Sequence, residues 1–143
     1  MTQEERRAKV AWLNRAFHAE KNAKAWMAKL ERDRSLAERI SRSTSGTGTG
    51  GTQGGNTTEN YLIRLAATQE GVQQALRDLA GIREEISATI RGVDDMDGQT
   101  ILVRHFLNYE NFDMVADQMG YSRATIMRKY RRVLEKLILN DTA

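Results

Sequence analysis

A cluster of basic side chains near the C-terminus is the feature of this sequence that most clearly suggests a binding function. Residues 121–137 carry six Lys or Arg and one acidic residue, so six minus one gives this stretch a net charge of about +5. Residues 94–117 carry one Arg and six acidic residues, so the net charge of this stretch is about −5. A basic segment that directly follows an acidic one favours contact with an anionic partner, and phosphate is the obvious candidate.

The spacing of small and capping residues around Gly120 predicts a sharp turn between two helices. Asn111 and Ser122 are side-chain types that cap helix N-termini, and glycine readily takes the left-handed conformation that ends a helix. Ala116, four residues before the glycine, is small where two helices must cross. Ile126, six residues after it, is expected to pack back into the crossing. This pattern is typical of a helix-turn-helix.

The second helix of this motif is predicted to have one apolar and one basic face. Its apolar stripe is Ile126, Tyr130, Val133, Leu134 and Leu137. The opposite face is predicted to read base edges, because arginine can bind guanine in a bidentate manner. Its residues are Arg123, Ala124, Met127, Arg128 and Arg131. A second group is predicted to contact phosphate, which positions a protein without specifying sequence. Its residues are Ser122, Thr125, Lys129 and Arg132. The alternative is an ordinary solvated basic helix in a bundle.

An enzyme, a metal site and a bound cofactor are not expected from this sequence. Cysteine is absent, which excludes thiolate nucleophiles and thiolate zinc ligands. The two histidines, His18 and His105, are far apart in the sequence, and His105 beside an apolar face is expected to be structural.

The acidic residues of the segment GVDDMDG do not fit a calcium-binding loop. With Gly98 at the required glycine, Val93 and Arg104 would occupy the first and last ligand positions, where carboxylates are needed. We therefore expect Asp94, Asp95 and Asp97 to be charges at the start of a helix over residues 99–107, where they complement its dipole.

Two long heptad stripes precede this region. A helix over residues 4–40 is predicted to bury Trp12, Ala16, Ala19, Ala23, Trp26, Leu30, Asp33, Ala37 and Ile40, with Asp33 as the polar interruption. A helix that begins after Thr58 as N-cap is predicted to bury Leu62, Leu65, Gln69, Val72, Leu76, Leu79, Arg83, Ile86, Ile90 and Val93. The Gly/Thr-rich residues 41–58 between them are predicted to form a flexible loop.

These elements predict an all-α protein with two regions. Proline is absent, and helix-forming residue types dominate outside the glycine-rich segment. Residues 1–93 are predicted to form an antiparallel, coiled-coil-like helical hairpin, and residues 94–143 a helix-turn-helix domain. The hairpin could be a structural spacer, a homodimerisation element or an arm that contacts RNA polymerase.

The chain also resembles a known class of regulators. The segment Leu13-Asn14-Arg15-Ala16-Phe17, the paired helices and residues 97–137 are similar to phage late-gene transcriptional regulators of the RinA and ArpU type. Residues 101–106 (ILVRHF) and 115–122 (VADQMGYS) are similar to the promoter-reading last region of bacterial sigma-70 factors.

The resemblance implies a phage- or prophage-encoded DNA-binding protein that acts with host RNA polymerase as a transcription activator of late genes. It also implies double-stranded DNA as partner and the cytoplasm of the bacterial host as location. No apolar run approaches the length of about 20 residues that a membrane-spanning helix needs, so no membrane contact is expected. A structural DNA-packaging protein, such as a small terminase subunit, is the alternative function.

Overall fold

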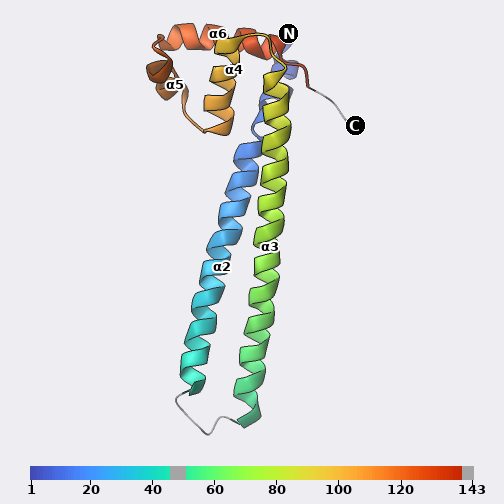
Figure 1. Cartoon of the computed structure of the whole chain (residues 1–143), viewed down its shortest axis with the longest axis vertical. Coiled ribbons are helices and arrows are strands. Elements are labelled where there is room, and N and C mark those ends of the chain that lie inside the picture. The colour runs from blue at the N-terminus through green and yellow to red at the C-terminus, as the bar shows by residue number, and fades with distance from the viewer. Residues whose placement is uncertain (46–50, 140–143) are drawn as a thin grey trace. The chain divides into compact units, whose positions relative to one another are not determined.

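The computed structural model describes residues 1–45 and 51–139, with side chains for residues 1–43 and 58–139. Every secondary-structure element in this part of the chain is helical, which confirms the predicted all-α class (Figure 1). The chain divides into two compact units. We call residues 20–78 the paired-helix unit, and residues 1–19 together with the chain from residue 79 onward the terminal unit. In the described part, no helix has the combined length and apolar character required to cross a membrane.

The paired-helix unit consists of parts of α2 (Arg15–Ser45) and α3 (Gly51–Arg91), which lie side by side and run in opposite directions (Figure 1). The two helices approach closely where Gly71 faces Trp26, because a Cβ on Gly71 would lie 2.5 Å from the indole ring. Further along α2, the carboxylate of Asp33 accepts hydrogen bonds from Thr68 Oγ1 at 2.7 Å and Lys29 Nζ at 2.9 Å. The predicted polar interruption at Asp33 is therefore a satisfied polar layer.

The stripe predicted for residues 12–40 faces inward throughout, whereas the stripe predicted for α3 does so only in part. Every member of the stripe predicted for residues 12–40 is buried or half-buried, which confirms it. On α3, however, Leu62, Gln69 and Leu76 are exposed. Thr68 and Ala75, the neighbours of the last two, are buried instead. Thr68 faces inward because it donates a hydrogen bond to Asp33, and Gly71 leaves the space that the Trp26 ring occupies.

The helices extend further into the Gly/Thr-rich segment than predicted. Helix α2 continues to Ser45 and α3 begins at Gly51, so Thr58 lies inside α3 and is not its N-cap. Helix elongation adds one hydrogen bond for each residue fixed, so a helix already established by packing can extend through residues of poor propensity. Residues 46–50 of the predicted loop lie outside the described part of the chain.

The terminal unit combines both ends of the described chain. It contains α1 (Gln3–Leu13), the beginning of α2, the end of α3, α4 (Met96–Leu102), the π-helical turn η1 (Val103–Leu107), α5 (Phe112–Met119) and α6 (Arg123–Lys136). Its core takes side chains from all of these segments, including Leu13, Ile86, Ile101, Phe106, Val115 and Ile126. The boundary between the units therefore differs from the predicted boundary at residue 93. Ile86, Ile90 and Val93 are buried in the same core as side chains of α4, α5 and α6.

The N-terminal helix is interrupted rather than continuous over residues 4–40. Helix α1 is capped at its start by Thr2, whose Oγ1 accepts from the Glu5 backbone N–H, and it ends at Leu13. Asn14, a residue of low helix propensity, separates α1 from α2. Beyond this break, α1 packs against α6, and Lys9 Nζ donates to the backbone oxygen of Leu134 at 2.8 Å.

Helix α4 starts three residues earlier than predicted. Asp95 is its N-cap and accepts from the Gly98 backbone N–H at 3.0 Å, which confirms the helix-start role of this carboxylate. Gly98 is buried against Val133 of α6, and the space that a Cβ would need is occupied by the valine side chain. From Val103 the helix takes π geometry, which ends with the Asn108 N–H donating to the Val103 oxygen at 2.9 Å.

Candidate nucleic-acid interface

The turn between α5 and α6 has the features predicted from its residue types. Asn111 Oδ1 caps α5 by accepting from the Met114 backbone N–H at 2.9 Å, and Ser122 Oγ caps α6 by accepting from the Thr125 N–H at 3.2 Å. Between them, Gly120 takes the left-handed conformation with φ of 74°. The Tyr121 N–H donates to the Ala116 oxygen at 3.1 Å, which closes the end of α5. Both caps and the turn are thus confirmed.

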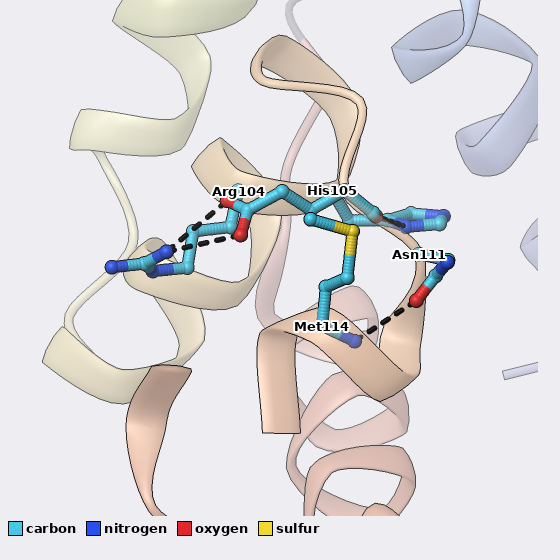
Figure 2. Close-up of polar contacts among 5 residues, drawn as sticks. Arg104, His105, Asn111 and Met114 are labelled. Carbon is cyan, nitrogen blue, oxygen red and sulfur yellow. Dashed lines mark hydrogen bonds and ion pairs between the residues drawn. The ribbon is translucent and has the colours of Figure 1, made fainter. Parts of the chain in front are cut away.

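The segment before α5 is held by polar contacts with η1 (Figure 2). Arg104 Nη1 lies 3.1 Å from each carboxylate oxygen of Glu110, and His105 Nδ1 lies 2.8 Å from the Glu110 backbone oxygen. Because a carbonyl oxygen only accepts, this Nδ1 carries the proton. These bonds fix the residue that directly precedes the Asn111 cap, and so they fix where α5 begins.

An aromatic cluster joins η1, α5 and α6. The ring of His105 stacks on Phe112, with centroids 4.0 Å apart and planes at 18°, and Phe112 lies 4.8 Å from the ring of Tyr130. Burial among these groups raises the pKa of the Tyr130 hydroxyl to about 12. The prediction that His105 is a packed structural residue is therefore confirmed.

Helix α6 has the two faces that its sequence predicts, except that Met127, predicted for the exposed face, is half-buried and packs against the core. All five members of the apolar stripe are buried: Ile126, Tyr130, Val133, Leu134 and Leu137. Seven of the nine predicted site residues are exposed or half-exposed without a carboxylate partner: Ser122, Ala124, Thr125, Met127, Arg128, Arg131 and Arg132. In the described part of the chain, the three arginines of this group form no ion pair. The exposed face therefore presents cations that are free to meet an anion.

The other two predicted site residues, Arg123 and Lys129, have carboxylate partners. Arg123 Nη1 lies 2.9 Å from Asp113, but both side chains are mostly exposed, so this pair is weak and readily exchanged. Lys129 Nζ lies 3.2 Å from Asp97, and only 31% of the lysine side chain is exposed. At the end of the same edge of α6, Lys136 Nζ lies 3.8 Å from Asp95. One edge of the helix is thus partly neutralised by the start of α4.

Asp97 and Tyr121 also belong to this surface, although neither is among the site residues predicted from the sequence. The Tyr121 hydroxyl donates to Asp97 Oδ2 at 2.8 Å. This hydrogen bond, followed by that from Lys129, holds the pKa of the Asp97 carboxyl below its usual value, and the same bond raises the pKa of Tyr121. Asp97 and Tyr121 are 24 positions apart in the sequence, and no local spacing pattern could have joined them.

A family model matches more than half of the chain. The sequence model of a family described as "Protein of unknown function (DUF1492)" matches residues 41–138. This range includes all of α3, α4, α5 and α6, together with the turn at Gly120, and it leaves α1 outside. No curated protein and no solved structure matches the chain.

Proposed function

The chain belongs to the family described as protein of unknown function (DUF1492), and because that description names no activity, we propose a function from the geometry of α5 and α6. The protein binds double-stranded DNA in a sequence-specific manner through α6 and regulates transcription. One observation carries this proposal: the left-handed turn at Gly120 leads into a capped helix that buries its apolar stripe and exposes Arg128 and Arg131.

The dimensions and chemistry of α6 suit the major groove. Its 14 residues extend for about 21 Å at 1.5 Å per residue, and the groove of B-form DNA admits one α-helix. Arg128 can donate two hydrogen bonds to guanine, and the apolar Ala124 and Met127 suit contact with thymine methyl groups. Arg132 is exposed, and in this proposal it contacts phosphate.

The role in transcription rests on the resemblance to phage late-gene regulators and to the last region of sigma-70 factors. In this proposal the protein binds upstream of a late promoter, in a bacterial host cell, and helps host RNA polymerase to start there. The stretch of greatest resemblance coincides with α4, η1, α5 and α6, which are the elements that build the candidate interface.

Selection of binding sites from a pool of random duplexes tests the DNA-binding part of the proposal. We expect one enriched sequence motif for the wild-type protein. Arg128→Ala should reduce the preference for that motif over random DNA, because a bidentate arginine contributes about 1 to 3 kcal/mol of base discrimination. Arg132→Ala should weaken binding to both kinds of DNA by similar factors. A selection that enriches no motif would contradict sequence-specific binding.

Transcription in vitro tests the regulatory part. A template with the selected motif upstream of a weak promoter, bacterial RNA polymerase and the purified protein should give more transcript than a template with a scrambled motif. Arg128→Ala should remove this difference. Equal transcript levels from the two templates, at protein concentrations that saturate the motif, would contradict a role in activation.

A further inference from the structure

We propose that Arg6 and Arg7 of α1 form a second phosphate-contacting surface, which extends the DNA contact of α6 onto the N-terminal helix. This inference rests on the proposed function, because it needs DNA to be bound at α6. Neither arginine belongs to the site predicted from the sequence, and α1 lies outside the range matched by the family model. The partner is the sugar-phosphate backbone of the same duplex, which carries no sequence information in such contacts.

Helix α1 has a fixed position against α6 within the terminal unit. Lys9 Nζ donates to the Leu134 oxygen at 2.8 Å, Leu13 is completely buried, and Val10 packs against the core. Arg6 also lies close enough to Tyr130 for its positive charge to oppose the burial that raises the pKa of this hydroxyl. The cations of α1 are therefore held beside the C-terminal half of α6 and are not carried on a loose terminal segment.

The two arginines of this surface are not engaged in ion pairs within the described part of the chain, although Glu4 and Glu5 precede them in the first turn of α1. Arg6 and Arg7 are both exposed. The carboxylate of the neighbouring Glu5 is engaged at the start of α1, where Oε2 accepts from the Thr2 backbone N–H at 3.2 Å. The two arginines also line a shallow surface hollow with Asn14 and His18, which adds polar groups to the same surface.

The edges of α6 differ in charge, and the difference favours the α1 side for DNA. Lys129 and Lys136 lie two turns apart on one edge, and both face carboxylates at the start of α4. Tyr130 and Leu134 lie one turn apart in the buried stripe of α6, near cations of α1: Lys9 Nζ donates to the Leu134 backbone oxygen, and the positive charge of Arg6 acts on the Tyr130 hydroxyl. One edge of α6 is therefore bordered by carboxylates, whereas α1 brings cations close to the helix. The backbone contacts should therefore extend toward α1.

The salt dependence of DNA binding tests this inference, because each phosphate contact adds about 0.9 to the slope of log K against log salt concentration. Fluorescence anisotropy with a labelled mixed-sequence duplex of about 30 base pairs provides the binding constants. We expect the double variant Arg6→Ala, Arg7→Ala to bind more weakly and to lower the steepness of this slope by about 1 to 2. The variant Arg6→Lys, Arg7→Lys keeps both charges and should retain the wild-type slope.

A matched control separates this local effect from a change in net charge. The variant Arg32→Ala, Arg39→Ala also removes two exposed arginines, but from α2 in the paired-helix unit, and its slope should equal that of the wild type. Thermal melting should be unchanged in all three variants, since every substituted side chain is exposed. Equal slopes for the α1 variant and the control would overturn the α1 surface and leave the proposed function standing. A wild-type protein that does not bind the duplex at low salt would overturn both.

Discussion

Lys129 of α6 reaches the carboxylate of Asp97 at the start of α4, with Nζ 3.2 Å from Oδ2. The same oxygen accepts from the Tyr121 hydroxyl at 2.8 Å, and the lysine Nζ lies 4.9 Å from the centroid of the tyrosine ring. One carboxylate thus links the start of α4, the turn after Gly120 and the middle of α6. A lysine predicted to contact phosphate must exchange this carboxylate for DNA before it can do so.

We therefore expect Asp97→Asn to tighten binding to duplex DNA. The substitution releases Lys129 and removes a negative charge from the edge of α6, so the dissociation constant for a mixed-sequence duplex at low salt should fall several-fold. Anisotropy titrations measure the change. Asp78→Asn is the matched control, because it removes one exposed carboxylate from the paired-helix unit. Equal affinities of the two variants would show that Asp97 does not compete with DNA for the lysine.

The same carboxylate predicts how stability depends on pH. Its pKa is lowered from 3.8 in the folded protein, chiefly by the Tyr121 hydrogen bond and then by Lys129. A carboxyl with a depressed folded-state pKa stabilises the protein fully above its unfolded pKa, and this contribution is lost as pH falls through the folded pKa. The difference in melting temperature between wild type and Asp97→Asn should be constant from pH 7 down to about 5 and should shrink below about pH 4. A difference that stays unchanged at pH 3 would contradict this assignment.

Gly120 should be replaceable only by residues that tolerate positive φ. No atom lies within 4 Å of the position that a Cβ would occupy, so the cost of substitution comes from the backbone at φ +74°. Gly120→Ala should lower the free energy of unfolding by about 1 kcal/mol, and Gly120→Asn by less, because asparagine visits this region more readily.

Gly120→Val provides the sharpest contrast, since a β-branched residue resists positive φ most strongly. Urea titrations followed by circular dichroism should rank the variants as wild type, Asn, Ala and Val in order of decreasing stability. A valine variant as stable as the wild type would contradict the left-handed conformation at this position.

Features set by neighbouring residues could be predicted from the sequence. The caps at Asn111 and Ser122, the turn at Gly120 and the apolar stripe of α6 depend on contacts within a few positions, so residue types and spacing suffice to identify them. The polar interruption at Asp33 could also be predicted, because Asp33 is a charged residue at a position of the heptad stripe that is otherwise apolar.

Features set by distant residues could not be predicted in the same way. The stripe of α3 was misplaced by one position at Thr68 and Ala75, because the periodicity of one helix does not reveal which face its partner requires. The packing of α1 on α6 joins Lys9 to Leu134, 125 positions apart, and no pattern within either helix indicates it. The ion pair of Lys129 with Asp97 could not be predicted for the same reason, because the two residues lie on helices whose packing no local pattern reveals.

Two glycines of α3 should respond in opposite ways to the same substitution. Replacing glycine by alanine inside a helix usually stabilises it by about 0.5 to 1 kcal/mol, because the unfolded chain loses backbone freedom. At Gly81 no atom lies within 4 Å of the new Cβ, so Gly81→Ala should show this gain. At Gly71 the Cβ would lie 2.5 Å from the Trp26 ring, so the indole and its neighbours must move.

Overpacking of this kind typically costs about 1 to 3 kcal/mol, which exceeds the gain in helix propensity. Gly71→Ala should therefore lower the free energy of unfolding, and Gly81→Ala should raise it, in urea titrations under identical conditions. The double variant Gly71→Ala, Trp26→Leu removes the clash and should recover part of the loss. If both single variants stabilise the protein to the same extent, the close contact between α2 and α3 at Trp26 is not present in solution.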